Sequence, residues 1–308
     1  MAPELIVNVL LTIATASTPL LIAAMGELVV ERSGVLNLGV EGMMIIGAVC
    51  GFGGAALSGN PWIGVLAGIA GGVLASMLFG VLTLSIATNQ VATGLSLTLL
   101  GLGLSGLLGE SFVGQAGNKL PAVDLGPLTD LPVIGRLLFG QDPLFYLSLL
   151  LVAGVSWFLF HSRAGLVLRA VGDSHDSAHA LGMSVIKIRY AAVAFGGACA
   201  GLAGAHLSLV YTTQWVENMT AGRGWIALAL VVFASWRPWR VLAGAYLFGG
   251  VTIGQLHAQA FGVSVPSQLL SALPYLATIV VLVFISRNRR LTILNTPACL
   301  GRPFVPHR

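Results

Sequence analysis

The chain has 308 residues, of which 56% are hydrophobic and 8% are charged, and its mean hydropathy is +0.91. About a quarter of the residues in an ordinary soluble domain are charged, so this composition excludes a water-soluble protein. The net charge of +4 does not indicate a nucleic-acid partner, because no array of aromatic and basic residues accompanies it beyond the short turn "WRPWR" at 236–240.

Apolar runs predict an all-α, polytopic helical membrane protein, with residues 1–308 forming a single transmembrane domain. A span needs roughly 20 apolar residues, and its backbone must hydrogen-bond within its own helix. About nine spans are expected, the seventh of them short: Leu5–Met25, Val35–Leu57, Trp62–Ile86, Val91–Leu108, Leu144–Phe160, Tyr190–Tyr211, Trp225–Ser235, Val241–His257 and Gln268–Ile285.

The distribution of basic residues predicts the orientation. Alternating the nine spans leaves three basic residues in or beside one set of loops, Lys119, Arg136 and Arg223. The other set holds the remaining twelve: Arg32, Arg163, Arg169, Lys187, Arg189, Arg237, Arg240, Arg287, Arg289, Arg290, Arg302 and Arg308. Basic residues favour the cytoplasmic side, so we expect the N-terminus outside and the C-terminus, with a tail at 286–308, inside.

The second span begins unusually, with "ERSGVLNLGVEGMM" at 31–44. Its glycines predict a break in this helix, and the freed backbone groups then need a water-lined cavity or a neighbouring helix. A carboxylate facing lipid costs about 3 kcal/mol, so Glu41 should face the bundle interior, paired with Asn37, a backbone amide or a proton. Two interpretations stay open: a polar staple between helices, or Asn37 and Glu41 lining the inner half of a solute path.

Other chemical signals in the spans are few. Glu41 is the only carboxylate within the predicted spans, and His206 and His257 are the other candidate intramembrane titratable groups. This argues against a membrane-embedded enzyme, which needs paired acids or a nucleophile with its base. The "GLGLSG" at 101–106 lies inside an apolar span rather than after a strand. No GxxxxGK[ST] loop is present to bind ATP, and the three cysteines form no CxxC pair.

The loop at 161–190, expected inside, contains a short helical element. Asp173 or Ser174 can cap its N-terminus, Asp176 lies near the positive end of its dipole, and Gly182 supplies its stop. Such an exposed helix is suited to touching a partner. The histidines of "HDSAH" at 175–179 resemble the zinc motif HExxH, but the acid is an Asp and no third ligand is evident, so no metal site is expected.

Two segments are expected on the outside. The loop at 109–143 is rich in Gly, Pro and Asp and predicts turns and short interfacial helices, either as a cap on the bundle or as a docking surface. The stretch "YTTQWVENMTAGRGWIAL" at 211–228 brings Gln214, Trp215 and Arg223 to the membrane rim. These residues are either interfacial anchors or the outer half of the solute path.

Four blocks in order resemble the permease subunits of ABC importers of the ribose and branched-chain-amino-acid type. They are the stretch from Glu31, then "NQVATGLSLTLLGLGLSG", the block from "SRAGLVLRAVGDSHDSAHALGM" to "GAHLSL", and "TAGRGWIALALVVFASWRPWRVLAGAYLFG". The wording "ERSGVLNLGVEGMM" is most similar to nucleoside permeases that work with basic-membrane-protein-type binding lipoproteins. The resemblance runs from Asn8 to Ile285.

The resemblance implies that the loop at 161–190 holds a coupling helix that docks on a separate ATPase. Its main residues would be Arg169, Asp173, Asp176, His179 and Gly182. ATP and Mg would bind that ATPase, and this chain would carry no cofactor and no catalytic site.

The implied partners are a second permease chain, distinct but homologous, a cytoplasmic ABC ATPase, an external binding protein or lipoprotein, and membrane lipid. The expected location is the bacterial inner (plasma) membrane, with many passes. The expected solute is a nucleoside or a related purine or pyrimidine compound. The alternatives are a simple sugar or another small polar solute, or a gradient-driven carrier.

Overall fold

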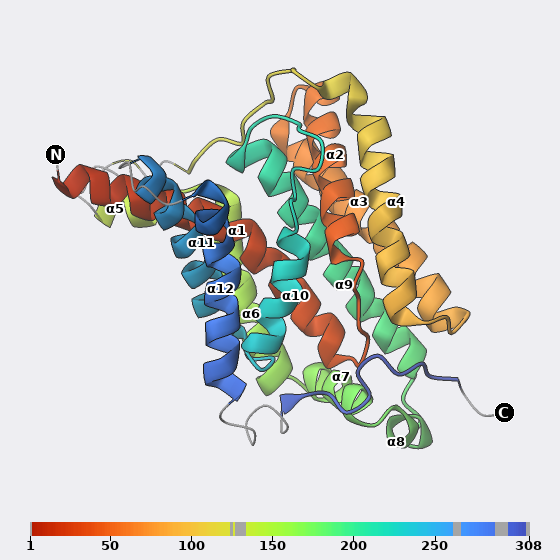
Figure 1. Cartoon of the computed structure of the whole chain (residues 1–308). Coiled ribbons are helices and arrows are strands. Elements are labelled where there is room, and N and C mark those ends of the chain that lie inside the picture. The colour runs from red at the N-terminus through yellow and green to blue at the C-terminus, as the bar shows by residue number, and fades with distance from the viewer. Residues whose placement is uncertain (1, 124–125, 127–133, 261–265, 287–294, 306–308) are drawn as a thin grey trace.

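The computed structural model describes residues 2–123, 126, 134–260, 266–286 and 295–305 (Figure 1). Every regular element in these ranges is a helix, which confirms the predicted all-α class. The long helices are α1 (Ala2–Arg32), α2 (Val40–Ser58), α3 (Pro61–Gly80), α4 (Gln90–Gly109), α6 (Pro143–His161), α9 (Val185–His206), α11 (Pro238–Ala260) and α12 (Ser267–Ser286). The shorter ones are α5 (Ile134–Phe139), α7 (Arg163–Asp173), α8 (His175–Ala180) and α10 (Arg223–Phe233).

A helix lies at each of the nine predicted spans. Among the described residues, seven helices are long and apolar enough to cross a membrane, while α10 has only 11 residues. The short seventh span was predicted from the sequence, and the number of crossings, nine, stays a prediction. Helices α3 and α9 each continue into one turn of π-helix, at Val81–Ser85 after α3 and at Leu207–Tyr211 after α9.

Local signals fix where several helices begin. The side chain of Asn60 accepts a hydrogen bond from Trp62 N, and Pro61 occupies the first turn of α3, where its missing N–H costs nothing. Asp142 accepts hydrogen bonds from the first two free backbone amides of α6. These caps satisfy donors that no helix can satisfy alone, so the loop residues set the first residue of each helix.

The centre of the bundle is built from α2, α3 and α9, which pack against one another at small residues. A Cβ atom at Gly47 of α2 would lie 2.4 Å from the backbone of Gly201 in α9, and one at Gly204 would lie 1.9 Å from the carbonyl oxygen of Met44. Small residues let membrane helices approach closely, and van der Waals contact rather than the hydrophobic effect then holds them together.

The two ends of the bundle differ in charge. At one end, called the α8 end below, Arg32 donates to Trp236 O (3.2 Å) and Arg189 donates to Arg302 O (3.2 Å). At the far end, the residues after α4 return to the bundle, where Asn118 donates to Ala55 O at the end of α2 (3.1 Å). The described basic residues of the predicted inside set lie at the end of α1, in α7, near the starts of α9 and α11, and in the C-terminal segment, so they gather at the α8 end (Figure 1).

Two boundaries differ from those expected. Helix α1 continues to Arg32 instead of ending at Met25, so it carries "GELVVER" within the bundle. Helix α2 begins at Val40 rather than Val35, and the residues between α1 and α2 are not helical, with Gly34 at φ +86°. Of the predicted second span, residues 35–39 are thus non-helical, and the helix that follows is continuous from Val40 to Ser58.

Candidate functional site

Glu41 lies in the first turn of α2 and is 3% exposed. One of its carboxylate oxygens accepts hydrogen bonds from Thr220 Oγ1 (2.5 Å) and Gly222 N (2.8 Å), and the other accepts one from Gly224 N (2.6 Å). The donors belong to the segment that leads into α10 and to its first turn. Glu41 thus accepts hydrogen bonds from backbone N–H groups that have no partner within α10, and its negative charge faces the positive end of that helix.

The N-termini of α2 and α10 meet at Glu41, and the two helices run toward opposite ends of the bundle. Helix α2 ends beside Asn118 at the far end, and α10 ends beside Arg32 at the α8 end (Figure 1). Each is preceded by a non-helical segment, at 33–39 and 212–222. Interrupted helices whose N-termini meet inside a bundle are a typical site of solute contact in transporters.

The five residues predicted to line a path occupy different environments. Asn37 is fully buried, and its side chain donates to Glu27 (3.5 Å) rather than to Glu41. Trp215 is also buried, with its ring against Gly109, while Gln214 is exposed. Arg223 is half-buried beside Glu41, between the two ends of the bundle, with its guanidinium over the Tyr211 ring (5.1 Å). The backbone on either side of Arg223 donates to Glu41, while the Arg223 side chain donates to Met219 O (3.0 Å). A role in a path stays a prediction for all five residues.

The expectation that Glu41 is the only carboxylate in the apolar interior is wrong. Glu27 and Glu31 of α1 are 1% and 0% exposed, because α1 continues past Met25. Glu31 accepts a hydrogen bond from Trp236 Nε1 (2.5 Å). A buried amide side chain, that of Gln90, likewise accepts a hydrogen bond from the amide of Leu36 (2.8 Å). The acids lie four residues apart on one helix face, and the apolar run between them was the signal for a longer span.

His206, one of the two candidate intramembrane histidines, is fully buried at the far end, and its Nε2 lies 3.6 Å from Asp142 Oδ1. His257 lies on α11, where its Nδ1 is 3.0 Å from Ile253 O, one turn earlier in the same helix. His257 thus has a partner within its own helix, whereas neither ring nitrogen of the buried His206 has a hydrogen-bond partner among the described residues, although Asp142 lies close to it.

The predicted helix in the loop at 161–190 is present as α8, and a second short helix, α7, precedes it. Ser174 caps α8, with its Oγ accepting from Ser177 N (3.3 Å), while Asp173 is the last residue of α7. Gly182 follows α8 with φ +82°, a conformation that favours glycine. Of the two candidate caps, the structure therefore selects Ser174.

The five predicted coupling residues lie around α7 and α8. Asp173, Asp176, His179 and Gly182 are exposed, and Arg169 is half-buried with its guanidinium 5.3 Å from the Phe160 ring centroid. The first four thus lie on an accessible surface of the α8 end. Their docking on an ATPase stays a prediction.

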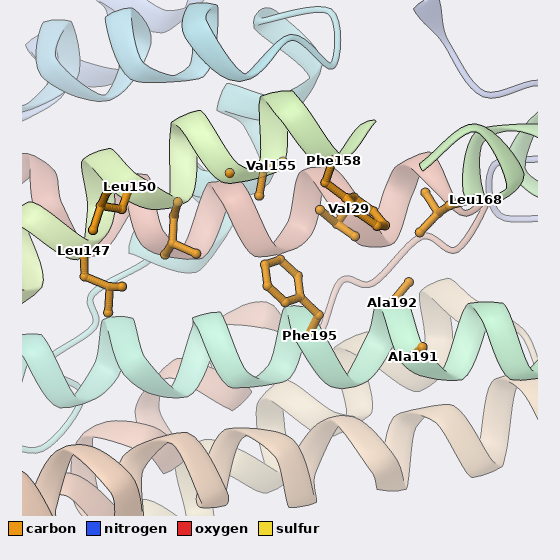
Figure 2. A pocket seen from close by; sticks show the side chains of 11 residues that line it. Val29, Leu147, Leu150, Val155, Phe158, Leu168, Ala191, Ala192 and Phe195 are labelled. Carbon is orange, nitrogen blue, oxygen red and sulfur yellow. The ribbon is translucent and has the colours of Figure 1, made fainter. Parts of the chain in front are cut away.

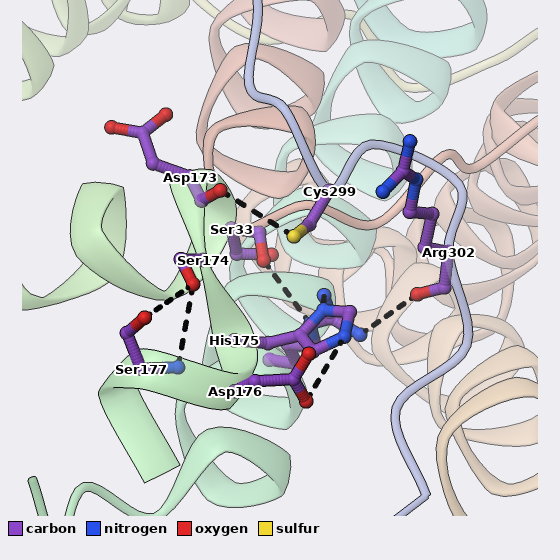
Figure 3. A network of polar contacts seen from close by, with 9 residues as sticks. Ser33, Asp173, Ser174, His175, Asp176, Ser177, Cys299 and Arg302 are labelled. Carbon is purple, nitrogen blue, oxygen red and sulfur yellow. Dashed lines mark hydrogen bonds and ion pairs between the residues drawn. The ribbon is translucent and has the colours of Figure 1, made fainter. Parts of the chain in front are cut away.

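Sequence reasoning missed a buried arginine beneath α8. Arg189, at the start of α9, is 1% exposed. It donates to Ser33 O after α1 (3.2 Å) and to Arg302 O of the C-terminal segment (3.2 Å), and its third nitrogen lies 3.2 Å from His175 Nδ1 (Figure 3). These partners are far apart in sequence, and a basic residue in a loop was read only as an orientation signal.

The environment of His175 requires a neutral ring. Its Nδ1 must accept from Arg189, and burial, together with the charge of Arg189, lowers the pKa of His175 below the usual 6.5, while Asp176 acts in the opposite direction and Arg302 in the same one. In the described part of the chain no group of three or more His, Cys, Asp or Glu side chains could hold a metal ion.

A groove lined by apolar side chains separates α6 from α9 along the face of α1 (Figure 2). It has a volume of about 440 Å³, and Phe195, Leu151 and Phe158 are among its lining residues. Its lining offers no polar group suited to binding a polar solute. A groove of this kind at membrane depth is compatible with lipid chains or an apolar partner surface.

The bundle of apolar helices, with an interrupted pair at its centre and a short exposed helix at its basic end, defines a polytopic membrane transport subunit. The family model for the permease component of the branched-chain amino acid transport system matches residues 9–285. The chain belongs to this family of ABC permeases.

Several curated relatives are similar over most of their length. A putative glucose ABC transporter permease from Haloferax volcanii is 42% identical, covering 92% of this chain and 93% of the relative. A guanosine ABC transporter permease from Bacillus subtilis is 31% identical, covering 94% and 93%. A nucleoside ABC transporter permease from Lactococcus lactis is 33% identical, covering 86% and 88%. No solved structure matches the chain.

Proposed function

We propose that this chain is the membrane-spanning subunit of an ATP-driven importer and forms one half of its solute pathway. The observation that carries this proposal is the placement of α8, a capped six-residue helix whose residues Asp176 and His179 are exposed at the basic end of the bundle. Since the sequence has no phosphate-binding GxxxxGK[ST] loop, the energy must come from another protein, and α8 offers that protein a surface to push on.

The proposed assembly follows from this surface. A cytoplasmic ABC ATPase, with ATP and Mg, docks on α8, so the α8 end faces the cytoplasm and the chain lies in the plasma membrane with many passes. A second, homologous permease chain encloses the path together with this one. An external binding protein docks on the far end, on the loop at 109–143 and the segment at 212–223.

For the solute we propose a nucleoside or a related purine or pyrimidine compound. The sequence "ERSGVLNLGVEGMM" around Glu41 and the relatives named for guanosine and nucleosides support this choice. A simple sugar is the second candidate, and the 42% identity to a permease named for glucose favours it. A ribose ring is common to nucleosides and to one class of sugars, so the same path could admit either group of solutes.

Uptake by a reconstituted transporter tests the proposal. The chain is co-purified with an ABC ATPase, a homologous permease and a binding protein from the same organism, and labelled guanosine and glucose are offered to proteoliposomes. ATP-dependent uptake that disappears when the ATPase is omitted is expected, and the solute taken up decides between the two candidates. Uptake by this chain alone, driven by an ion gradient, would contradict the proposal.

A further inference from the structure

The described C-terminal segment, residues 297–305, packs against the elements around α8 instead of extending away from them. The amide of Cys299 donates to Gly172 O in α7 (2.9 Å), and the amide of Gly301 donates to Gly34 O in the connection between α1 and α2 (3.1 Å). The backbone of this segment therefore bridges two parts of the α8 end that are far apart in sequence.

Phe304 is the apolar contact between this segment and α8. It is 8% exposed, and its ring stands edge-on to His175 (5.2 Å between centroids) and His179 (5.3 Å). It also belongs to a small buried cluster with Val171, Ala178 and Val185, residues of α7, of α8 and of the start of α9. Phe304 thus fills the space between α8 and the bundle.

Helix α8 depends on such packing. A helix of six residues is too short to be stable alone in water, because the cost of its first turn is not recovered over so few hydrogen bonds. Its buried residues are His175 and Ala178, and Phe304 contacts the first and clusters with the second. The outer side remains free, with Leu181 77% exposed.

Arg189 connects the same segment to the rest of the bundle. It donates both to Arg302 O and to Ser33 O, and it contacts His175. From Ser33 the chain leads through the non-helical connection to Asn37 and then to Glu41. Arg189 therefore joins α8 and the C-terminal segment to the non-helical connection that leads into α2.

We propose that residues 297–305 support the coupling helix α8 during transport. Phe304 is the positioning residue that holds α8 where it contacts the ATPase. This inference rests on the proposed function, because it assigns α8 the task of transmitting the ATPase cycle. The chain's C-terminal segment then serves as the support against which α8 is pushed, and its removal would let α8 move without moving the bundle.

The test compares Phe304→Ala with Val305→Ala in the complete transporter. Val305 is the next residue and is 62% exposed, so its truncation removes apolar atoms from the same segment without disturbing α8. Solute imported per ATP hydrolysed should fall roughly tenfold in Phe304→Ala, a size typical of coupling between linked sites, and should stay unchanged in Val305→Ala. A normal ratio in Phe304→Ala would overturn the inference.

Two further measurements keep the test decisive. If Phe304→Ala fails to assemble, Phe304→Leu retains an apolar side chain, and a lowered ratio would support the inference while a normal one would overturn it. Amide hydrogen exchange of residues 174–181 should be faster in Phe304→Ala than in Val305→Ala, and equal exchange would refute the support of α8 by Phe304. Failure of the wild-type complex to import any solute would instead contradict the proposed function.

Discussion

Replacing Glu41 by Gln should destabilise the contact between α2 and α10. The carboxylate accepts three hydrogen bonds, two on one oxygen and one, from Gly224 N, on the other. A glutamine keeps one oxygen, so its NH₂ group must face at least one N–H or O–H donor. Hydrogen bonds to a charged group contribute about 1.5–3 kcal/mol each, and a buried donor left unpaired costs about 1–3 kcal/mol. The expected loss is about 3 kcal/mol or more.

Thermal unfolding of the purified chain in detergent measures this loss. Glu41→Gln should unfold at a clearly lower temperature than the wild type, whereas Thr220→Ser, which keeps the hydroxyl donor, should unfold close to it. An unchanged unfolding temperature for Glu41→Gln would refute the clamp. Uptake by the assembled Glu41→Gln transporter addresses the second interpretation, because normal uptake would remove any role of Glu41 as a gate.

Two further predictions concern packing and pH. Gly204→Ala should destabilise the bundle by about 3 kcal/mol, because its Cβ would lie 1.9 Å from Met44 O, while Gly103→Ala, with nothing within 4 Å, should be neutral or slightly stabilising in the same unfolding assay. Lowering the pH below about 6.5, the usual pKa of histidine, should loosen α8. The pKa of His175 is lower when α8 is packed beside Arg189 than when α8 is freed. Acid therefore favours the freed form, which binds the proton more readily. After division by the intrinsic exchange rate at each pH, the protection of the amides of residues 174–181 should fall in acid for the wild type but not for His175→Asn, and a pH-independent protection in the wild type would contradict this.

Local signals made the helices predictable. Apolar runs predicted nine places at which the structure has a helix. Ser174, one of two candidate caps, and Gly182 marked the ends of α8, and the glycines near Glu41 indicated the non-helical stretch before α2. Each of these depends on residues within one or two turns of each other, so the sequence alone contains the information. Of the three partners considered for Glu41, the structure shows a backbone amide and not Asn37, and a buried carboxylate needs such donors.

Contacts between distant segments were not predictable in the same way. The partner of Glu41 is α10, nearly 180 residues later, and Asn37, its neighbour in sequence, bonds Glu27 instead. Nothing near Phe304 indicates that it packs beneath α8, because the tail reads as a polar terminus. The burial of Glu27 was missed because the first span was ended at Met25, before the acids, whereas helix α1 continues to Arg32.

The most direct test of the account is the position of α8 in the working transporter. Leu181→Cys, placed in a chain whose three native cysteines are replaced by serine, puts a single thiol at the exposed end of α8. The account predicts that a membrane-impermeant thiol reagent labels it only in inverted vesicles, and that a short crosslinker joins it to the ATPase. Labelling from outside intact cells, or no crosslink to the ATPase in the assembled complex, would contradict the account.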